Sequence, residues 1–218
     1  RTAFFNIKKV VILLLSNSFT ELILVVGALI FRVPIPFTAV QILWTNLVED
    51  GLPNFALAFE PPEAGVMKKK PIKRNASLLD TQGKILSYPM GVIMDIILFF
   101  IYFELYELHQ GAYISLEYLR TFMFMAIGTD SLVYIFALRS LDQPFWKVNH
   151  LNNKYFLMAV VAGIWLMLAA VYVPILNFVL ETEPLSLFHL SWILGLGIFK
   201  LFLVEFVKWL HNRREQAA

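Results

Sequence analysis

Residues 37–59 of this 218-residue chain read FTAVQILWTNLVEDGLPNFALAF. The stretch is long enough to cross a membrane, which takes roughly 20 mostly apolar residues in a helix. It nevertheless carries Glu49 and Asp50 near its middle, directly before Gly51 and Pro53. A carboxylate at bilayer depth costs roughly 2.5–3.5 kcal/mol on insertion scales, so an intramembrane acid indicates a functional site. The stretch predicts a membrane helix that is interrupted at an acidic position.

Five further apolar segments of similar length occur in the chain. Hydrophobic residues make up 59% of the sequence and charged residues only 16%, below the quarter or so typical of soluble domains. We therefore predict an all-α polytopic membrane protein, a bundle of six transmembrane helices that forms one domain over residues 1–218. The expected spans are residues 10–31, 37–59, 85–105, 119–138, 155–176 and 187–210, with a loop at residues 60–84.

Composition also excludes several kinds of site. The chain has no cysteine, which excludes disulfides, thiolate metal sites and Fe–S clusters. Its net charge is only +2, and the basic residues lie between apolar blocks, so nucleic acid is not expected as a partner. The expected surroundings are the lipid bilayer, and the expected location is a bacterial plasma membrane.

The distribution of basic residues predicts the orientation. If the amino end is cytoplasmic, fifteen of the eighteen Lys and Arg residues lie on the cytoplasmic side. Arg32 and Arg120 then lie outside, and Lys200 lies within the last span. Cytoplasmic loops are enriched in Lys and Arg, so both termini are predicted to be cytoplasmic. The chain begins at Arg1 without a signal-peptide pattern, which we interpret as a cut through a longer polypeptide.

Three spans carry an acid at a similar depth. Glu21, Asp50 and Asp130 each lie about nine to eleven residues from the inner end of their span. This places all three about 13–17 Å above the cytoplasmic boundary, at the helical rise of roughly 1.5 Å per residue. Acids from different helices at one depth favour a shared site over three separate structural roles.

Carboxamide and hydroxyl groups lie three or four residues from these acids, on the same helical faces. Gly51 permits local unwinding, and Pro53 removes an amide donor and frees a carbonyl. Broken helices that line a cavity coordinate cations through such carbonyls. The resulting all-oxygen set suits hard cations such as Ca²⁺, Mg²⁺ or Mn²⁺. The candidate metal ligands are Glu21, Asn46, Glu49, Asp50, Asp130, Ser18 and Asn17.

Other intramembrane polar residues are given structural roles. Asp95 and Lys200 have no clear partner in the sequence, and we interpret them as a structural pair or as side chains that reach toward the interface. Glu205 and Lys208 are about one turn apart and are expected to form a local ion pair. His189 is expected to be a hydrogen-bonded histidine and not a metal ligand.

Residues 41–62, QILWTNLVEDGLPNFALAFEPP, closely resemble the sixth transmembrane helix of type II cation-transporting P-type ATPases. Residues 6–9 and 16–21 resemble the fifth helix, and the later spans fit the seventh to tenth helices in number and orientation. The chain thus resembles the C-terminal transmembrane domain of calcium-pump-like bacterial members. The resemblance implies an ATP-driven cation pump that works by alternating access. It also implies ligand positions at Ser18, Glu21, Asn46, Glu49 and Asp50.

The sequence departs from the calcium pumps at three ligand positions. Ser18 stands where they have asparagine, and Glu49 stands where they have threonine. The acid of their eighth helix has no match near Ala137, and Asp130 lies about two turns earlier. The transported ion is therefore left open, with Ca²⁺ as the first choice and Mn²⁺, Mg²⁺, Na⁺ or H⁺ as alternatives.

The resemblance covers only part of such a pump. The phosphorylated Asp-Lys-Thr-Gly motif is absent, as are the actuator and nucleotide-binding domains, so the chain cannot hydrolyse ATP alone. ATP and Mg²⁺ would act only in those missing domains, which are the expected partners. The resemblance assigns contact with the phosphorylation domain to a basic segment of the 60–84 loop, for which attraction to anionic lipid is the alternative. This coupling segment comprises Lys68, Lys69, Lys70, Lys73 and Arg74.

Two other classes of function remain possible on the residues alone. A secondary cation/proton antiporter or a channel would use the same intramembrane acids without the missing domains. A non-transporting helical remnant would only bind partners through its basic loop.

Overall fold

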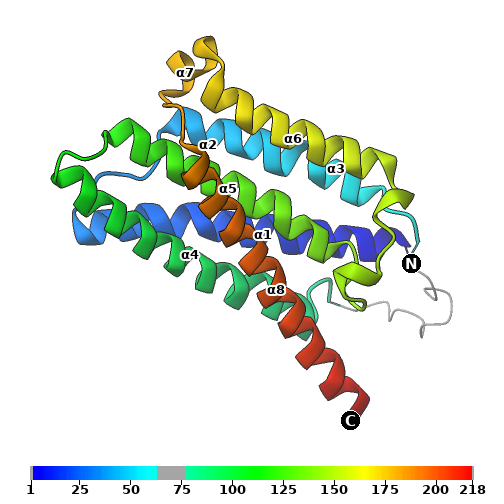
Figure 1. Ribbon diagram of the computed structural model, residues 1–218. Coiled ribbons are helices and arrows are strands. Elements are labelled where there is room, and N and C mark those ends of the chain that lie inside the picture. Colours follow the sequence, from blue (N-terminus) through cyan, green and yellow to red (C-terminus); the bar gives the residue numbers. More distant parts are fainter. Residues whose placement is uncertain (1, 63–76, 218) are drawn as a thin grey trace.

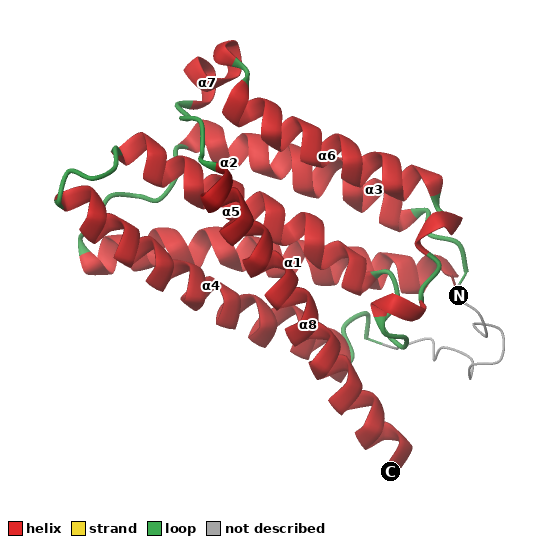
Figure 2. Ribbon diagram, in the orientation of Figure 1, coloured by secondary structure: helices red, strands yellow, loops and turns green. Residues whose placement is uncertain are grey.

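The computed structural model describes residues 2–62 and 77–217, apart from the side chains of Asp50 and residues 214–217. Within these residues all regular structure is helical (Figures 1 and 2). Five described helices are long and apolar enough to cross a membrane, which confirms a multi-pass membrane protein. They are α1 (Thr2–Phe31), α4 (Thr81–Gln110), α5 (Leu116–Leu138), α6 (Lys154–Tyr172) and α8 (Leu187–Ala217).

The remaining expected span, residues 37–59, is built from three short helices that follow one another. These are α2 (Ala39–Thr45), the π-helix η1 (Asn46–Gly51) and α3 (Leu52–Ala58). Thr38 begins this series as the N-cap of α2, in a capping box with Gln41. The interruption falls where the sequence carries its acids, glycine and proline.

Short helices also form the connections between the spans. The fifth expected span ends early, at Tyr172, because Pro174 lacks the N–H needed to continue α6 and instead begins α7 (Pro174–Leu180). The connection between α5 and α6 contains two 3₁₀ turns, η3 (Phe145–Lys147) and η4 (His150–Asn152). Asn153 then caps α6 by accepting a hydrogen bond from the Phe156 amide at 3.0 Å.

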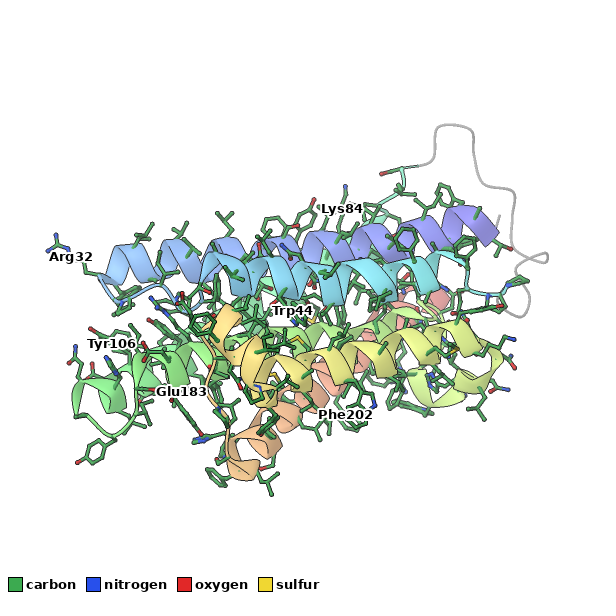
Figure 3. The ribbon with its side chains drawn as sticks, turned by 90° about the horizontal axis from the view of Figure 1, so that it is seen from above. Arg32, Trp44, Lys84, Tyr106, Glu183 and Phe202 are labelled. Atoms are coloured by element: carbon green, nitrogen blue, oxygen red, sulfur yellow. The ribbon has the colours of Figure 1, made fainter. Side chains whose placement is uncertain are left out.

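Helix α5 forms the centre of the bundle, and most of its side chains are buried. Helix α1 packs along α4, α3 packs on α6, and α8 crosses over α5 (Figure 1). Figure 3 places Arg32, Tyr106 and Glu183 toward one end of the bundle, which we call the outer end. The opposite end, where α4 begins and α3 ends, is called the inner end.

The apolar core consists of two clusters stacked along the bundle. The outer cluster includes Leu24 of α1, Leu98 of α4 and Phe124 of α5. The inner cluster includes Ile12 of α1 and Tyr134 of α5, together with residues of α3, α4, α6 and α8. Along α1, α4 and α8, the residues between the two clusters include the buried polar side chains of Thr20, Asp95 and Lys200. A polar layer therefore separates two apolar ones.

Candidate cation site

The polar layer brings together side chains from five elements. It contains Thr20 of α1, Glu49 of η1, Asp95 of α4, Asp130 of α5 and Lys200 of α8. All five are at most 8% exposed. Charged groups at such depth persist only when they are paired, neutralised or bound to an ion. The layer therefore contains buried carboxylates of the kind that an ion site uses.

The π-helix η1 is the local irregularity at this layer. The sequence indicated an unwound backbone at Gly51 and Pro53, whereas the chain stays helical and widens into a π-helix over Asn46–Gly51. Pro53 has no amide hydrogen to donate to the carbonyl four residues earlier, so the regular α-helical pattern cannot continue there. Single π-helical turns within α-helices occur frequently at functional sites.

The widened turn directs Glu49 into the protein interior, where it is 2% exposed. Its neighbour Val48 is fully buried, and the Val48 side chain lies near the position that a Cβ on Gly163 of α6 would take. Asn46, the first residue of η1, is half-buried. The side chain of Asp50 lies outside the described part of the structure, although its backbone belongs to η1.

Gln41, Thr45 and Glu49 follow one another at intervals of four residues on the α2–η1 segment. The Thr45 hydroxyl donates to the Gln41 carbonyl at 2.9 Å, and the Gln41 amide donates to the Leu180 carbonyl at 3.0 Å. Gln41 and Thr45 are both buried. We did not predict this polar face from the sequence. The four-residue spacing of Gln41, Thr45 and Glu49 could have indicated it.

Glu21 of α1 meets this face across a small cavity. Glu21, Gln41 and Thr45 line the cavity with four apolar side chains, and its volume is about 10 Å³. That is close to the smallest space that holds one water molecule, about 10–15 Å³. The structure thus brings Glu21 next to the helix that carries Glu49, as a cation site between α1 and η1 would require.

Asn17 and Ser18 make different contacts. The Asn17 amide donates to the Ser131 hydroxyl at 3.0 Å and so connects α1 with α5. The Ser18 hydroxyl is exposed in this chain and donates to the Leu14 carbonyl of its own helix at 2.8 Å. Of these two candidates, only Asn17 points into the described bundle.

Asp130 forms a buried ion pair with Lys200 of α8. The Lys200 ammonium also lies 4.5 Å from the centre of the Tyr134 ring. The pairing that the sequence suggested, Asp95 with Lys200, is therefore corrected: Lys200 bonds Asp130, and Asp95 accepts a hydrogen bond from Thr20 at 2.7 Å. A ligand role for Asp130 remains a prediction, and it would require Lys200 to move away.

The described carboxylates and histidines do not by themselves form a complete metal centre. No group of three or more His, Asp or Glu side chains comes together at metal-binding distance within the described residues. Glu21 and Glu49 would therefore need further oxygen ligands to hold a metal ion.

Two local predictions from the sequence are confirmed. Glu205 and Lys208 form an ion pair at 2.7 Å, three residues apart on α8. His189 Nδ1 lies 2.6 Å from the Tyr118 hydroxyl and 3.0 Å from the Ser186 hydroxyl, as expected for a hydrogen-bonded histidine.

Basic and acidic groups also pair at the inner end. Lys8 of α1 contacts the Asp80 carboxylate at 2.6 Å, and the Gly83 amide donates to Asp80 at 2.8 Å. Partial burial acts to raise the pKa of Asp80, but the Lys8 ammonium and the Gly83 amide outweigh it and hold that pKa below its ordinary value. The predicted coupling residues Lys68, Lys69, Lys70, Lys73 and Arg74 lie outside the described residues.

Comparison with known proteins gives a consistent result. Residues 34–210 match the family described as "Cation transporting ATPase, C-terminus". The chain is 30% identical over 206 residues to a calcium-transporting ATPase of Bacillus subtilis. This alignment covers 94% of this chain and 22% of the relative. It is 26% identical over 220 residues to calcium-transporting ATPase 1 of Bacillus cereus, with 95% and 25% covered. Human calcium-transporting ATPase type 2C member 1 is 30% identical over 212 residues, with 97% and 22% covered. The chain thus spans about a quarter of the length of these relatives.

Proposed function

Because this chain belongs to the family of cation-transporting ATPase C-terminal domains, we propose that it contributes part of the Ca²⁺-binding site of an ATP-driven pump. The observation that carries the proposal is the buried Glu49 carboxylate on a π-helical turn, four residues after Thr45, which lines a cavity together with Glu21. Three relatives with calcium transport in their names support Ca²⁺ as the cation.

The proposed ligands are the acids and amides nearest to that turn. Glu21, Asn46, Glu49 and Asp50 form the central set, and Asn17 and Ser18 are secondary members. Ca²⁺ takes six to eight oxygen ligands, so the remainder would come from Thr45, backbone carbonyls or other helices of the longer protein. Asp130 is a conditional member, because its carboxylate binds Lys200 and would reach Ca²⁺ only after Lys200 moves away.

Alternating access would use the π-helical turn as the moving part. A π-helix has one more residue in its turn than the α-helix on either side, so a change between the two forms rotates the following side chains by about 100°. Such a rotation would carry Glu49 and Asp50 toward or away from Glu21. Affinity would then differ between two conformations, as transport requires. Protons could neutralise the empty carboxylates on the return step.

The energy source would lie outside this chain. Phosphoryl transfer needs a phosphate cradle, Mg²⁺ and a positioned nucleophile. In the longer protein, movement of the phosphorylation domain would reach η1 through the inner ends of α1 and α3. Glu60, directly after α3, is joined there to α1 by a hydrogen bond from Asn6 to its carbonyl at 2.7 Å. A bacterial plasma membrane is the proposed location.

The test is cation-dependent phosphorylation of the full-length protein. Glu49→Gln and Asp50→Asn keep the side-chain shape but remove the charge that a divalent cation needs. Each is expected to raise the Ca²⁺ concentration required for phosphorylation by ATP at least about tenfold, equivalent to 1.4 kcal/mol of binding free energy. Glu104→Gln, an exposed acid on α4, is the matched control. An unchanged Ca²⁺ requirement in both variants would remove η1 from the site.

A further inference from the structure

A cavity of about 550 Å³ lies at the inner end of the bundle, between α8 and the connection from α5 to α6. Sites for small organic ligands have volumes of about 300–1,000 Å³. Figure 1 shows α8 leaving the bundle at this end. Trp146 of η3 and Phe206 and Trp209 of α8 line the cavity with exposed rings. Tryptophan is enriched where membrane proteins meet the lipid headgroups, so we place the cavity at that level.

Arg213 brings a positive charge to this cavity. Its guanidinium carbon lies 4.1 Å from the centre of the Trp209 ring, which holds the group beside the cavity. None of the ion pairs among the described side chains includes Arg213. The other two charged lining residues, Glu205 and Lys208, neutralise each other at 2.7 Å. The lining thus has a net charge of +1, which favours a ligand with one negative charge over a zwitterionic one.

Glu205 adds a hydrogen-bond acceptor that lacks a donor. The residue is 3% exposed, and its Oε2 atom has no hydrogen-bond partner among the described residues. The Lys208 ammonium donates to Glu205 Oε1 and, at 2.9 Å, to the Ala137 carbonyl. A buried acceptor without a donor in the protein calls for one in a bound molecule. Glu205 therefore favours a ligand that carries a hydroxyl or an amine.

A second cavity lies further toward the membrane centre. It has a volume of about 250 Å³, and its lining is mostly apolar, with Phe136 of α5, Ile164 of α6 and Leu194 of α8 among its residues. Leu194 and Phe202 each line one of the two cavities, and eight residues separate them on α8. This corresponds to about 12 Å along the helix axis. Half of a bilayer's hydrocarbon core is about 15 Å thick, so a single phospholipid is long enough to reach both cavities.

We propose that the two cavities bind one anionic phospholipid with hydroxyl groups in its head, of the phosphatidylglycerol type. The phosphate lies against the Arg213 guanidinium, and a headgroup hydroxyl donates to Glu205 Oε2. An acyl chain extends toward Leu194. Arginine forms charge-assisted hydrogen bonds with phosphate, and basic pockets between membrane helices bind anionic headgroups. None of these residues is among the proposed Ca²⁺ ligands, so the inference goes beyond the proposed function.

The experiment measures thermal unfolding of the full-length protein in detergent while a lipid is titrated at constant Ca²⁺. Phosphatidylglycerol is expected to stabilise at lower concentration than phosphatidylcholine, whose headgroup has no net charge and no hydrogen-bond donor. Phosphatidylmethanol keeps the negative charge but lacks headgroup hydroxyls, and it is expected to fall between the two. Glycerol 3-phosphate has no acyl chains and is expected to have no effect. Stabilisation by glycerol 3-phosphate would assign the site to a free phosphate and overturn the proposal.

Two variants test the two parts of the site. Arg213→Gln is expected to raise the phosphatidylglycerol concentration for half-maximal stabilisation about fivefold, the effect of one basic residue at an anionic membrane surface. Lys154→Gln is the matched control, because Lys154 is also exposed at the inner end and lies 5.3 Å from the Tyr155 ring. Ile164→Trp fills the apolar cavity from a partly exposed position and is expected to weaken the response to phosphatidylglycerol and phosphatidylmethanol alike.

Three other outcomes would contradict the proposal. Equal responses to phosphatidylglycerol and phosphatidylcholine would show that the site does not select an anionic lipid. An Arg213→Gln response as strong as that of Lys154→Gln would show that Arg213 does not bind the phosphate. Equal responses to phosphatidylglycerol and phosphatidylmethanol would remove Glu205 as the headgroup acceptor. The readout does not depend on phosphorylation or transport, so its failure is separate from failure of the proposed Ca²⁺ site.

Discussion

The Arg139 guanidinium binds the Glu60 carboxylate at the inner end of the bundle, with 2.8 Å between Arg139 Nε and Glu60 Oε1. Both side chains are buried. The Asn153 amide donates to the other Glu60 oxygen at 2.8 Å, and the Arg139 guanidinium lies 4.6 Å from the centre of the Phe156 ring. The pair thus fixes the chain directly after α3 to the end of α5 and the start of α6.

Loss of one partner of this ion pair is expected to destabilise the protein strongly. Arg139→Met leaves the Glu60 carboxylate buried without its cation, at an expected cost of about 3–5 kcal/mol in the free energy of unfolding. The double variant Arg139→Met/Glu60→Gln should recover part of the loss, because no uncompensated charge remains. Thermal unfolding in detergent measures both effects. If the double variant loses as much stability as Arg139→Met and Glu60→Gln lose when their separate effects are added, the two residues do not interact.

The Thr45 hydroxyl is expected to matter for cation binding. Thr45→Val keeps the shape of a buried side chain that lines the cavity beside Glu21 but removes its oxygen. We expect apparent Ca²⁺ affinity in the full-length protein to fall about tenfold or more, in the range seen when groups around metal sites are removed. Ser191→Ala removes an exposed hydroxyl on α8 and is the control. Equal affinities in the two variants would place the ion elsewhere.

Gly163 of α6 is expected to tolerate no side chain without rearrangement. An added Cβ would lie 2.9 Å from Leu132 Cδ2 and 3.5 Å from Val48 Cγ1, next to η1. Gly163→Ala should therefore lower the free energy of unfolding by about 1–3 kcal/mol through overpacking. Gly195→Ala is the matched control, since a Cβ there meets no atom within 4 Å. In that exposed helical position alanine should instead stabilise, by up to about 1 kcal/mol.

The Lys8–Asp80 pair predicts a pH dependence. The pKa of Asp80 is held below its ordinary 3.8, so the pair adds stability above that value and loses it as pH falls through the lowered pKa. Asp80→Asn keeps an N-cap oxygen for the Gly83 amide but removes the charge. Because the Asp80 side chain is 57% exposed, the expected loss near neutral pH is no more than about 1 kcal/mol.

The comparison of unfolding free energies as a function of pH checks this expectation. The difference between wild type and Asp80→Asn should be largest near neutral pH and should shrink below about pH 4, where the wild-type carboxyl also becomes neutral. A difference that grows with acidification would have the opposite sign and would contradict the assignment.

Features within one helix were the most predictable from the sequence. The Glu205–Lys208 pair follows from a spacing of three residues, and the interruption near Gly51 and Pro53 follows from the chemistry of those residues alone. The form of that interruption was less predictable, because an unwound turn and a π-helical turn can both accommodate the missing amide hydrogen of Pro53. Packing of Val48 and Glu49 into the interior is consistent with the π-helical form.

The sequence by itself determined that the chain crosses a membrane repeatedly and where polar groups occur along each span, because apolar length and local spacing are properties of single helices. Only the tertiary structure decided which polar groups meet. Lys200 bonds Asp130, seventy residues away, and Glu60 bonds Arg139, seventy-nine residues away. Such pairs depend on how helices cross and rotate against one another, and a buried charge takes the partner that this packing brings within reach.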